Sequence, residues 1–166
     1  AKESDIAAIG PWLNHGTLYG KGNPLEGRVW TDDQLRGKFV GIDPGIKPLT
    51  EQQIELYHQA RAAIDQSLED NAKALMFRHV NKYGIAFDKD MSLADVAEVV
   101  RQQLDDQIEA AKTRAGELQN LIDDPETEFG DEDARDATAR LERDIEKAEK
   151  LAADLEQVKK TITGIE

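Results

Sequence analysis

Two long runs in the C-terminal half of this chain repeat an apolar side chain every three or four positions, with no proline inside either run. In the first run these positions are Leu93, Val96, Val100, Leu104, Ile108, Ala111, Ala115, Leu118 and Ile122. In the second run they are Ala134, Thr138, Leu141, Ile145, Ala148, Ala152, Leu155, Val158 and Ile162. Such spacing places one apolar stripe along an α-helix. We therefore predict helices over 93–122 and 131–162.

The segment between these helices determines how they pack. Pro125 ends the first helix, because the residue before a proline avoids the α region. The acidic connection that follows has only about nine residues, which makes the two helices antiparallel neighbours. Gly116 lies inside the first helix, where a close approach of the second helix would explain it, and Gly164 is expected to end the second helix.

A third long helix is predicted over 51–83. Thr50 and Gln53 have the spacing of a capping box at its start, and Gly84 suits the left-handed position after its end. Its own apolar stripe would be buried most easily against the hairpin. A longer, splayed arm is the alternative. Ser92 is the expected N-cap of the following helix.

The first 49 residues are predicted to be an irregular arm. Residues 1–30 hold five glycines and two prolines, although Ile6 to Leu13 could form one short helical turn. A second capping box, Thr31 to Gln34, predicts one short helix that ends near Phe39. The fold class is therefore all-α: an elongated three-helix bundle over 50–166, with a long antiparallel helical hairpin, after an irregular arm over 1–49.

Three aromatic residues stand out in the arm: Trp12, Tyr19 and Trp30. A segment rich in glycine and proline builds no core of its own. These side chains are therefore expected either to pack on the bundle or to dock on another domain or chain.

The net charge of −13 is concentrated in the hairpin. Residues 92–166 contain 21 acidic and ten basic side chains, which gives −11 for that half. Direct binding of nucleic acid through the acidic half is excluded, because it would require basic side chains to neutralise phosphates. The charge is typical of a solvated helix face, or it could attract a basic partner and imitate DNA.

No pattern in the chain indicates catalysis. The chain has no cysteine, and His15, His58 and His79 are too far apart to share a metal ion. Asp88 and Asp90 resemble the start of a calcium loop but lack the later glycine and glutamate. We therefore predict no catalytic residue, no cofactor and no metal. The chain also has no membrane-length apolar run or signal peptide, and we expect it in the cytoplasm.

One stretch resembles a known family. The matching residues are Gly16-Thr-Leu, Gly27-Arg-Val-Trp-Thr-Asp-Asp-Gln-Leu-Arg36, Leu49-Thr-Glu-Gln-Gln-Ile-Glu-Leu-Tyr57 and Arg61-Ala-Ala-Ile-Asp-Gln-Ser-Leu68. Over roughly 13–80 the chain resembles a linker region of very large polyvalent proteins of phages and mobile elements, which join helicase, methylase and other modules. The resemblance implies a helical spacer or docking segment, a fragment of a larger protein, with neither helicase nor methylase activity of its own.

Three functional hypotheses follow. The first is a non-catalytic helical interaction or spacer segment whose partners are other domains of its parent protein or a separate protein. The second is an acidic decoy that imitates DNA and occupies a basic nucleic-acid-processing enzyme. The third is a coiled-coil module that forms a homo-oligomer.

Overall fold

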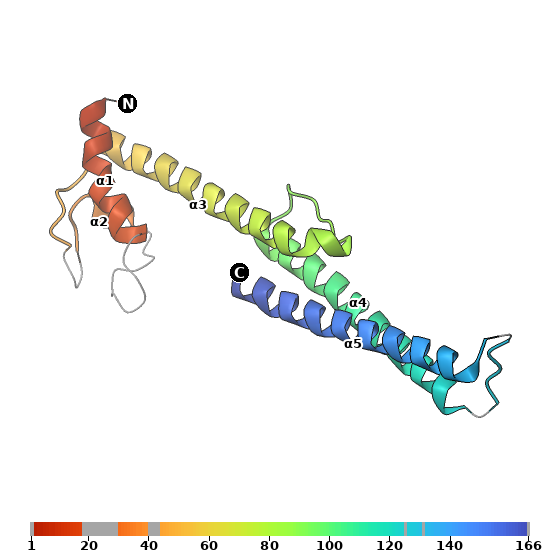
Figure 1. Ribbon diagram of the computed structural model, residues 1–166. Helices are drawn as coiled ribbons and strands as arrows, with labels where there is room; N and C mark the ends of the chain where they lie inside the picture. The colour runs from red at the N-terminus through yellow and green to blue at the C-terminus, as the bar shows by residue number, and fades with distance from the viewer. Residues whose placement is uncertain (1, 18–29, 40–43, 125, 131, 166) are drawn as a thin grey trace. The chain divides into compact units, whose positions relative to one another are not determined.

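The computed structural model describes residues 2–17, 30–39, 44–124, 126–130 and 132–165. Over these residues the chain is all-α and contains no strand, which confirms the predicted fold class. Five α-helices and one short 3₁₀ helix follow one another along the described chain (Figure 1). The chain divides into two compact units, the N-terminal unit (Ala1–Leu68) and the C-terminal unit (Glu69–Glu166).

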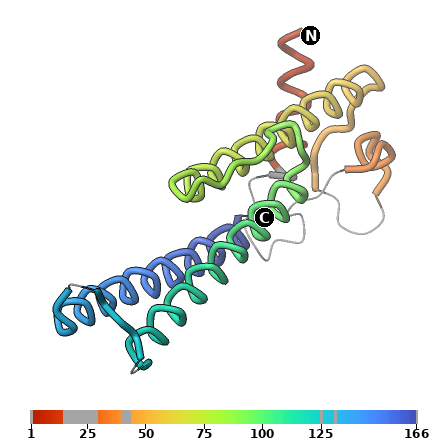
Figure 2. Tube along the Cα trace, turned by 90° about the vertical axis from the view of Figure 1, so that its right-hand side faces the viewer, coloured from red at the N-terminus to blue at the C-terminus, as the bar shows by residue number. Residues whose placement is uncertain are grey.

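The predicted hairpin forms most of the C-terminal unit. Helices α4 (Leu93–Asp123) and α5 (Ala134–Ile165) run antiparallel and side by side, as Figures 1 and 2 both show. The predicted range of α4 is correct to within one residue, and that of α5 is displaced by three residues at each end. The apolar stripes face each other, and most of their large side chains are buried.

Two apolar clusters hold this unit together. The proximal cluster consists of Met76, Val80, Ile85, Val96, Ala97, Val100, Leu104, Ile108, Leu155 and Ile162. The distal cluster consists of Ala115, Leu118, Leu141 and Ile145. Met76 and Val80 of a third helix, α3, belong to the proximal cluster. Among the described residues, the distal cluster is built from α4 and α5, with Phe129 of their connection packed against it.

Ser92 and Gly84 take the capping positions that the sequence predicts, and Asp133 is a further cap. The Ser92 hydroxyl accepts a hydrogen bond from the backbone N–H of Asp95, and the Asp133 carboxylate accepts one from the N–H of Arg135. Gly84 has φ 71°, in the left-handed region, and follows the short 3₁₀ helix η1 (Asn81–Tyr83). Ser92 and Asp133 satisfy N–H groups that have no partner inside the helix, whereas the N–H of Gly84 donates to the carbonyl of Asn81.

Helix α3 (Glu51–Val80) begins at the predicted capping box. The Thr50 hydroxyl accepts from the N–H of Gln53, and the Gln53 side chain accepts from the N–H of Thr50. The expectation that its whole stripe packs on the hairpin needs correction. Its first turns enter a core of the N-terminal unit through Ile54 and Tyr57, and its last turns enter the proximal cluster through Met76 and Val80.

The predicted irregular arm also needs correction. Helix α1 (Glu3–Thr17) has 15 residues and contains Pro11, and α2 (Asp32–Leu35) follows at the Thr31 capping box. A proline inside a helix removes one backbone hydrogen bond. Burial compensates here, because Ile9 and Trp12, three residues apart on one side of α1, are 4% and 0% exposed. Tertiary packing overrides the local preference.

Three further expectations are wrong. The division between the units falls inside α3, between Leu68 and Glu69, rather than at 49/50. Gly116 is not explained by a close helix approach, since a Cβ atom built there would meet no atom of another element within 4 Å. Gly164 does not end α5, which continues to Ile165.

Candidate interaction surfaces

Trp12 and Trp30 lie in the interior of the N-terminal unit rather than on its surface. Their exposed fractions are 0% and 1%, and their rings meet edge to face with centroids 5.3 Å apart. The Trp30 indole N–H donates to the carbonyl of Trp12, and the Trp12 indole N–H donates to the carbonyl of Lys47. Both indoles are packed against the first turns of α3, which corresponds to the predicted packing on the bundle. Tyr19 lies outside the described residues.

These indoles belong to a larger group that we call the aromatic core: Ile9, Trp12, Trp30, Leu35, Leu49, Ile54 and Tyr57. The Tyr57 hydroxyl accepts a hydrogen bond of 3.4 Å from the backbone N–H of Trp30, and burial raises the pKa of Tyr57. Phe39 stacks on Trp12 with centroids 6.0 Å apart. The aromatic core therefore joins α1, α2 and the first turns of α3 into one unit.

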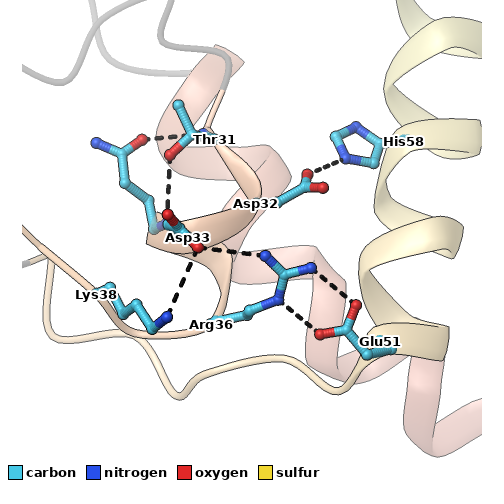
Figure 3. Close-up of polar contacts among 8 residues, drawn as sticks. Thr31, Asp32, Asp33, Arg36, Lys38, Glu51 and His58 are labelled. Atoms are coloured by element: carbon cyan, nitrogen blue, oxygen red, sulfur yellow. Dashed lines mark hydrogen bonds and ion pairs between the residues drawn. The ribbon is translucent and has the colours of Figure 1, made fainter.

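A polar cluster on the surface of the same unit fastens α2 to α3 (Figure 3). Arg36 Nε lies 2.6 Å from Glu51 Oε1, and Arg36 Nη2 lies 2.9 Å from Glu51 Oε2, a bidentate pair. The hydrogen bond to Glu51 raises the pKa of Arg36, and the reciprocal bond lowers the pKa of Glu51. Asp33 makes longer contacts with Arg36 and Lys38. The cluster holds the start of α3 beside α2.

His58 and Asp32 form the one pair in this cluster that resembles catalytic chemistry. His58 Nε2 lies 2.6 Å from Asp32 Oδ1, and both side chains are about half exposed, at 47% and 49%. A catalytic dyad needs a nucleophile or substrate proton on the other ring nitrogen of the histidine. Within the described residues no hydroxyl group is hydrogen-bonded to His58. This pair, 26 residues apart in sequence, ties α2 to α3.

A second polar arrangement in the C-terminal unit was not apparent from the sequence. Lys73 is only 7% exposed, and its Nζ lies 3.0 Å from Glu69 Oε1 and 3.2 Å from the carbonyl of Lys89. The same Glu69 oxygen accepts the backbone N–H of Leu93, the first residue of α4. The pair therefore fixes the α3–α4 connection. Its i,i+4 spacing was visible, but an exposed helix pair has the same spacing.

Cross-helix ion pairs line one side of the hairpin. Lys112 Nζ lies 2.6 Å from Glu156 Oε1, and Lys159 Nζ lies 2.6 Å from Asp105 Oδ1. The hydrogen bond from Lys112 lowers the pKa of Glu156. These pairs are solvent-exposed and set the register of α4 against α5 more than they stabilise it. Many other acidic side chains of α5, among them Glu142, Glu146 and Glu149, are exposed to solvent.

Two further features were sought among the described residues, a metal-ligating group and a membrane-length helix. No group of three or more His, Cys, Asp or Glu side chains comes together among them as a metal ion would need. None of the described helices combines the length and apolar character of a membrane-spanning segment. No family model, curated protein or solved structure matches the chain. The described fold is all-α, with a long antiparallel pair of helices, α4 and α5.

Proposed function

We propose that this chain is a non-catalytic helical interaction or spacer segment of a larger, phage-derived multidomain protein that carries helicase or methylase modules elsewhere. The resemblance over roughly 13–80 provides the context. That stretch contains most of the aromatic core and the whole of α3. The same stretch contains no helicase or methylase motif.

One observation carries the proposal: α3 contributes to the cores of both compact units. Ile54 and Tyr57 are buried in the aromatic core, and Met76 and Val80 are buried in the proximal cluster. Between them, Leu68 is 56% exposed and Leu75 is 42% exposed. A helix that begins in one core and ends in another is suited to linking parts of a protein.

The polar residues of the described chain support a structural role. Helix α2 is held against α3 by the pairs Arg36–Glu51 and Asp32–His58. The α3–α4 connection is held by Glu69 and Lys73. Each has a partner that accounts for its position. None of these groups surrounds a space in which a substrate would meet a nucleophile and a base.

The first test measures hydrolysis of ATP and GTP by the purified chain and by His58→Ala, with His79→Ala as the control. We expect all three rates to equal that of buffer. A rate well above buffer that only His58→Ala abolishes would contradict the proposal.

The second test places a photo-crosslinking residue at exposed Asp154 in the full parent protein. We expect crosslinks to other segments of the same polypeptide or of its assembly. Crosslinks confined to α4 and α5 would argue against an interaction segment.

A second candidate function is the acidic decoy, which the charge of −11 over residues 92–166 favours. Its test is binding to a basic DNA-processing enzyme, measured at low and high salt. Glu142→Gln/Glu149→Gln removes two exposed acids of α5, and Glu3→Gln/Glu55→Gln removes two in the N-terminal unit. The decoy predicts that only the first variant weakens binding and that salt weakens it further. Equal binding by both variants, insensitive to salt, rejects it.

A further inference from the structure

Helix α3 presents a different side to each of the two cores that it enters. Tyr57 is buried in the aromatic core, and Met76 is buried in the proximal cluster. These residues are 19 positions apart, which at about 3.6 residues per turn places their side chains roughly 100° apart around the helix axis. The buried side of α3 therefore changes along the helix, and the side that is buried at its start is not the side that is buried at its end.

One turn of α3 lies where this change occurs. Asp65, Gln66, Ser67 and Leu68 follow one another in sequence, and all four residues are exposed. Four consecutive residues complete a full turn of an α-helix, so this turn is open to solvent on every side. The division between the two compact units also falls at its end, after Leu68. We call residues 65–68 the open turn.

The parts of α3 on either side of the open turn are attached to other elements. Before the turn, Ala60 packs against the aromatic core. After the turn, the Glu69 carboxylate accepts the backbone N–H of Leu93, and Lys73 Nζ donates to the carbonyl of Lys89. The open turn therefore lies between the attachments of α3 to two separate cores, and it contributes no residue to either cluster.

The sequence around the open turn gives the helix little stability of its own. The stretch Asp65-Gln-Ser-Leu-Glu-Asp-Asn71 has seven residues, of which four are Asp, Ser or Asn. These short polar side chains compete with the helix for backbone hydrogen bonds and have low helix propensity. Most helices in proteins are stabilised by tertiary packing, and short helical segments without packing are marginal in water. The hydrogen bonds of the open turn therefore depend on local preferences that are weak.

We propose that the open turn is a hinge, whose helical hydrogen bonds break and re-form while the aromatic core and the proximal cluster stay folded. The amides of residues 65–72 report this opening, because each helical bond joins the N–H of one residue to the carbonyl four residues earlier. Opening of the turn leaves the contacts of both clusters intact and lets the two compact units move independently. This inference goes beyond the proposed function, since a spacer could equally be rigid.

The first test follows amide hydrogen exchange of the full chain, residue by residue, by NMR. We expect the amides of 65–72 to exchange at least about tenfold faster than those of 57–60 and 76–80, because a local opening costs less free energy than unfolding a core. Trp30→Ala and Leu155→Ala, which weaken the two cores, should leave the rates at 65–72 within about twofold. Equal rates in all three ranges would overturn the proposal.

The second test places a proline in the open turn. Proline removes one helical hydrogen bond and clashes with the carbonyl four residues earlier. We expect Ser67→Pro to leave the urea midpoints of tryptophan fluorescence and far-UV circular dichroism unchanged, because neither core uses this turn. The matched control is Glu109→Pro, at an exposed position of α4 beside buried Ile108, and it should move the far-UV midpoint to much lower urea. An equally large shift in Ser67→Pro would overturn the hinge.

The outcomes of these tests are separate from those of the crosslinking experiment. Slow exchange at 65–72, together with crosslinks from Asp154 that reach other segments of the parent protein, would reject the hinge and keep the proposed function. Fast exchange at 65–72, with crosslinks confined to α4 and α5, would keep the hinge and count against the proposed function.

Discussion

The two compact units are stabilised in different ways. In the N-terminal unit the decisive contacts join residues far apart in sequence, such as Trp12 with Lys47 and Trp30 with Tyr57. In the C-terminal unit α4 and α5 bury a regular stripe of Leu, Ile, Val and Ala. The first unit therefore depends on a few large aromatic side chains with hydrogen-bonded indoles. The second depends on many small contacts repeated along two helices, and this difference can be tested.

The largest effect is expected from Trp30→Ala, which removes a fully buried indole. Large-to-small substitutions of buried aromatic residues cost about 3–5 kcal/mol. Both tryptophans of the chain lie in the N-terminal unit, so their fluorescence reports its unfolding. We expect the fluorescence transition to shift to much lower urea, with the hairpin helicity in far-UV circular dichroism retained. Trp30→Phe is the control, and it should cost less. Equal loss of both signals would show that the units unfold as one.

A smaller effect is expected from Leu155→Ala in the proximal cluster. Leu155 is 0% exposed, and such a substitution costs about 2–5 kcal/mol, depending on how far the site relaxes. The far-UV transition should move to lower urea while the tryptophan transition stays in place. Leu151→Ala, at a position 42% exposed, is the control and should cost far less. If Trp30→Ala destabilised the hairpin more than Leu155→Ala did, the contrast between the units would be lost.

The sequence predicted the C-terminal unit much better than the N-terminal one, for a physical reason. Periodicity shows which face of a helix is apolar. In a hairpin with a short connection, the helix that covers this face is nearly always the next one along the chain. Hence the ranges of α4 and α5, the Ser92 cap and the Thr50 capping box were all predictable. Periodicity does not show which distant segment covers a face. The burial of Trp12 under Trp30 and the His58–Asp32 pair therefore could not be derived.

Helix α1 and the Glu69–Lys73 pair illustrate the same limit. Gly10 and Pro11 disfavour a helix locally, and only the aromatic core, assembled from α2 and α3 as well, offsets that cost. The i,i+4 spacing of Glu69 and Lys73 is also that of an ordinary surface pair, whereas the structure shows a nearly buried lysine that holds a connection. In both cases the deciding contact comes from another element.

Gly116→Ala should stabilise the C-terminal unit by about 1 kcal/mol, the difference in helix propensity between the two residues. The added methyl group meets no atom of another element within 4 Å, so no steric cost opposes the gain. The matched control is Gly84→Ala, which should destabilise the same unit because φ at Gly84 is 71°. Both are measured from the far-UV urea transition. A loss of stability in Gly116→Ala would mean that the helices approach each other more closely there.

The smallest effects are expected at one exposed glutamate in each unit. The dependence of these effects on pH distinguishes a role in charge from a role in packing. Arg36 lowers the pKa of Glu51 and Lys112 lowers that of Glu156, both from an ordinary value of 4.5. A carboxylate whose pKa is lower in the folded state contributes stability above its unfolded pKa and loses it as the pH falls through the folded value. At neutral pH, Glu51→Gln should therefore lower the tryptophan transition and Glu156→Gln the far-UV transition.

Thermal melts of each variant and the parent chain, from pH 7 down to about pH 2, provide the measurement. Each difference should be only about 1–3 °C at neutral pH and should vanish in acid, where the parent carboxyl is protonated too. Glu51→Gln should show the larger difference, because Arg36 holds Glu51 through two hydrogen bonds and Lys112 holds Glu156 through one. A difference that persisted unchanged in acid would place the role of that glutamate in packing rather than in charge. If Glu51→Gln has the larger effect and that effect vanishes in acid, the contrast between the units extends from their cores to their surfaces.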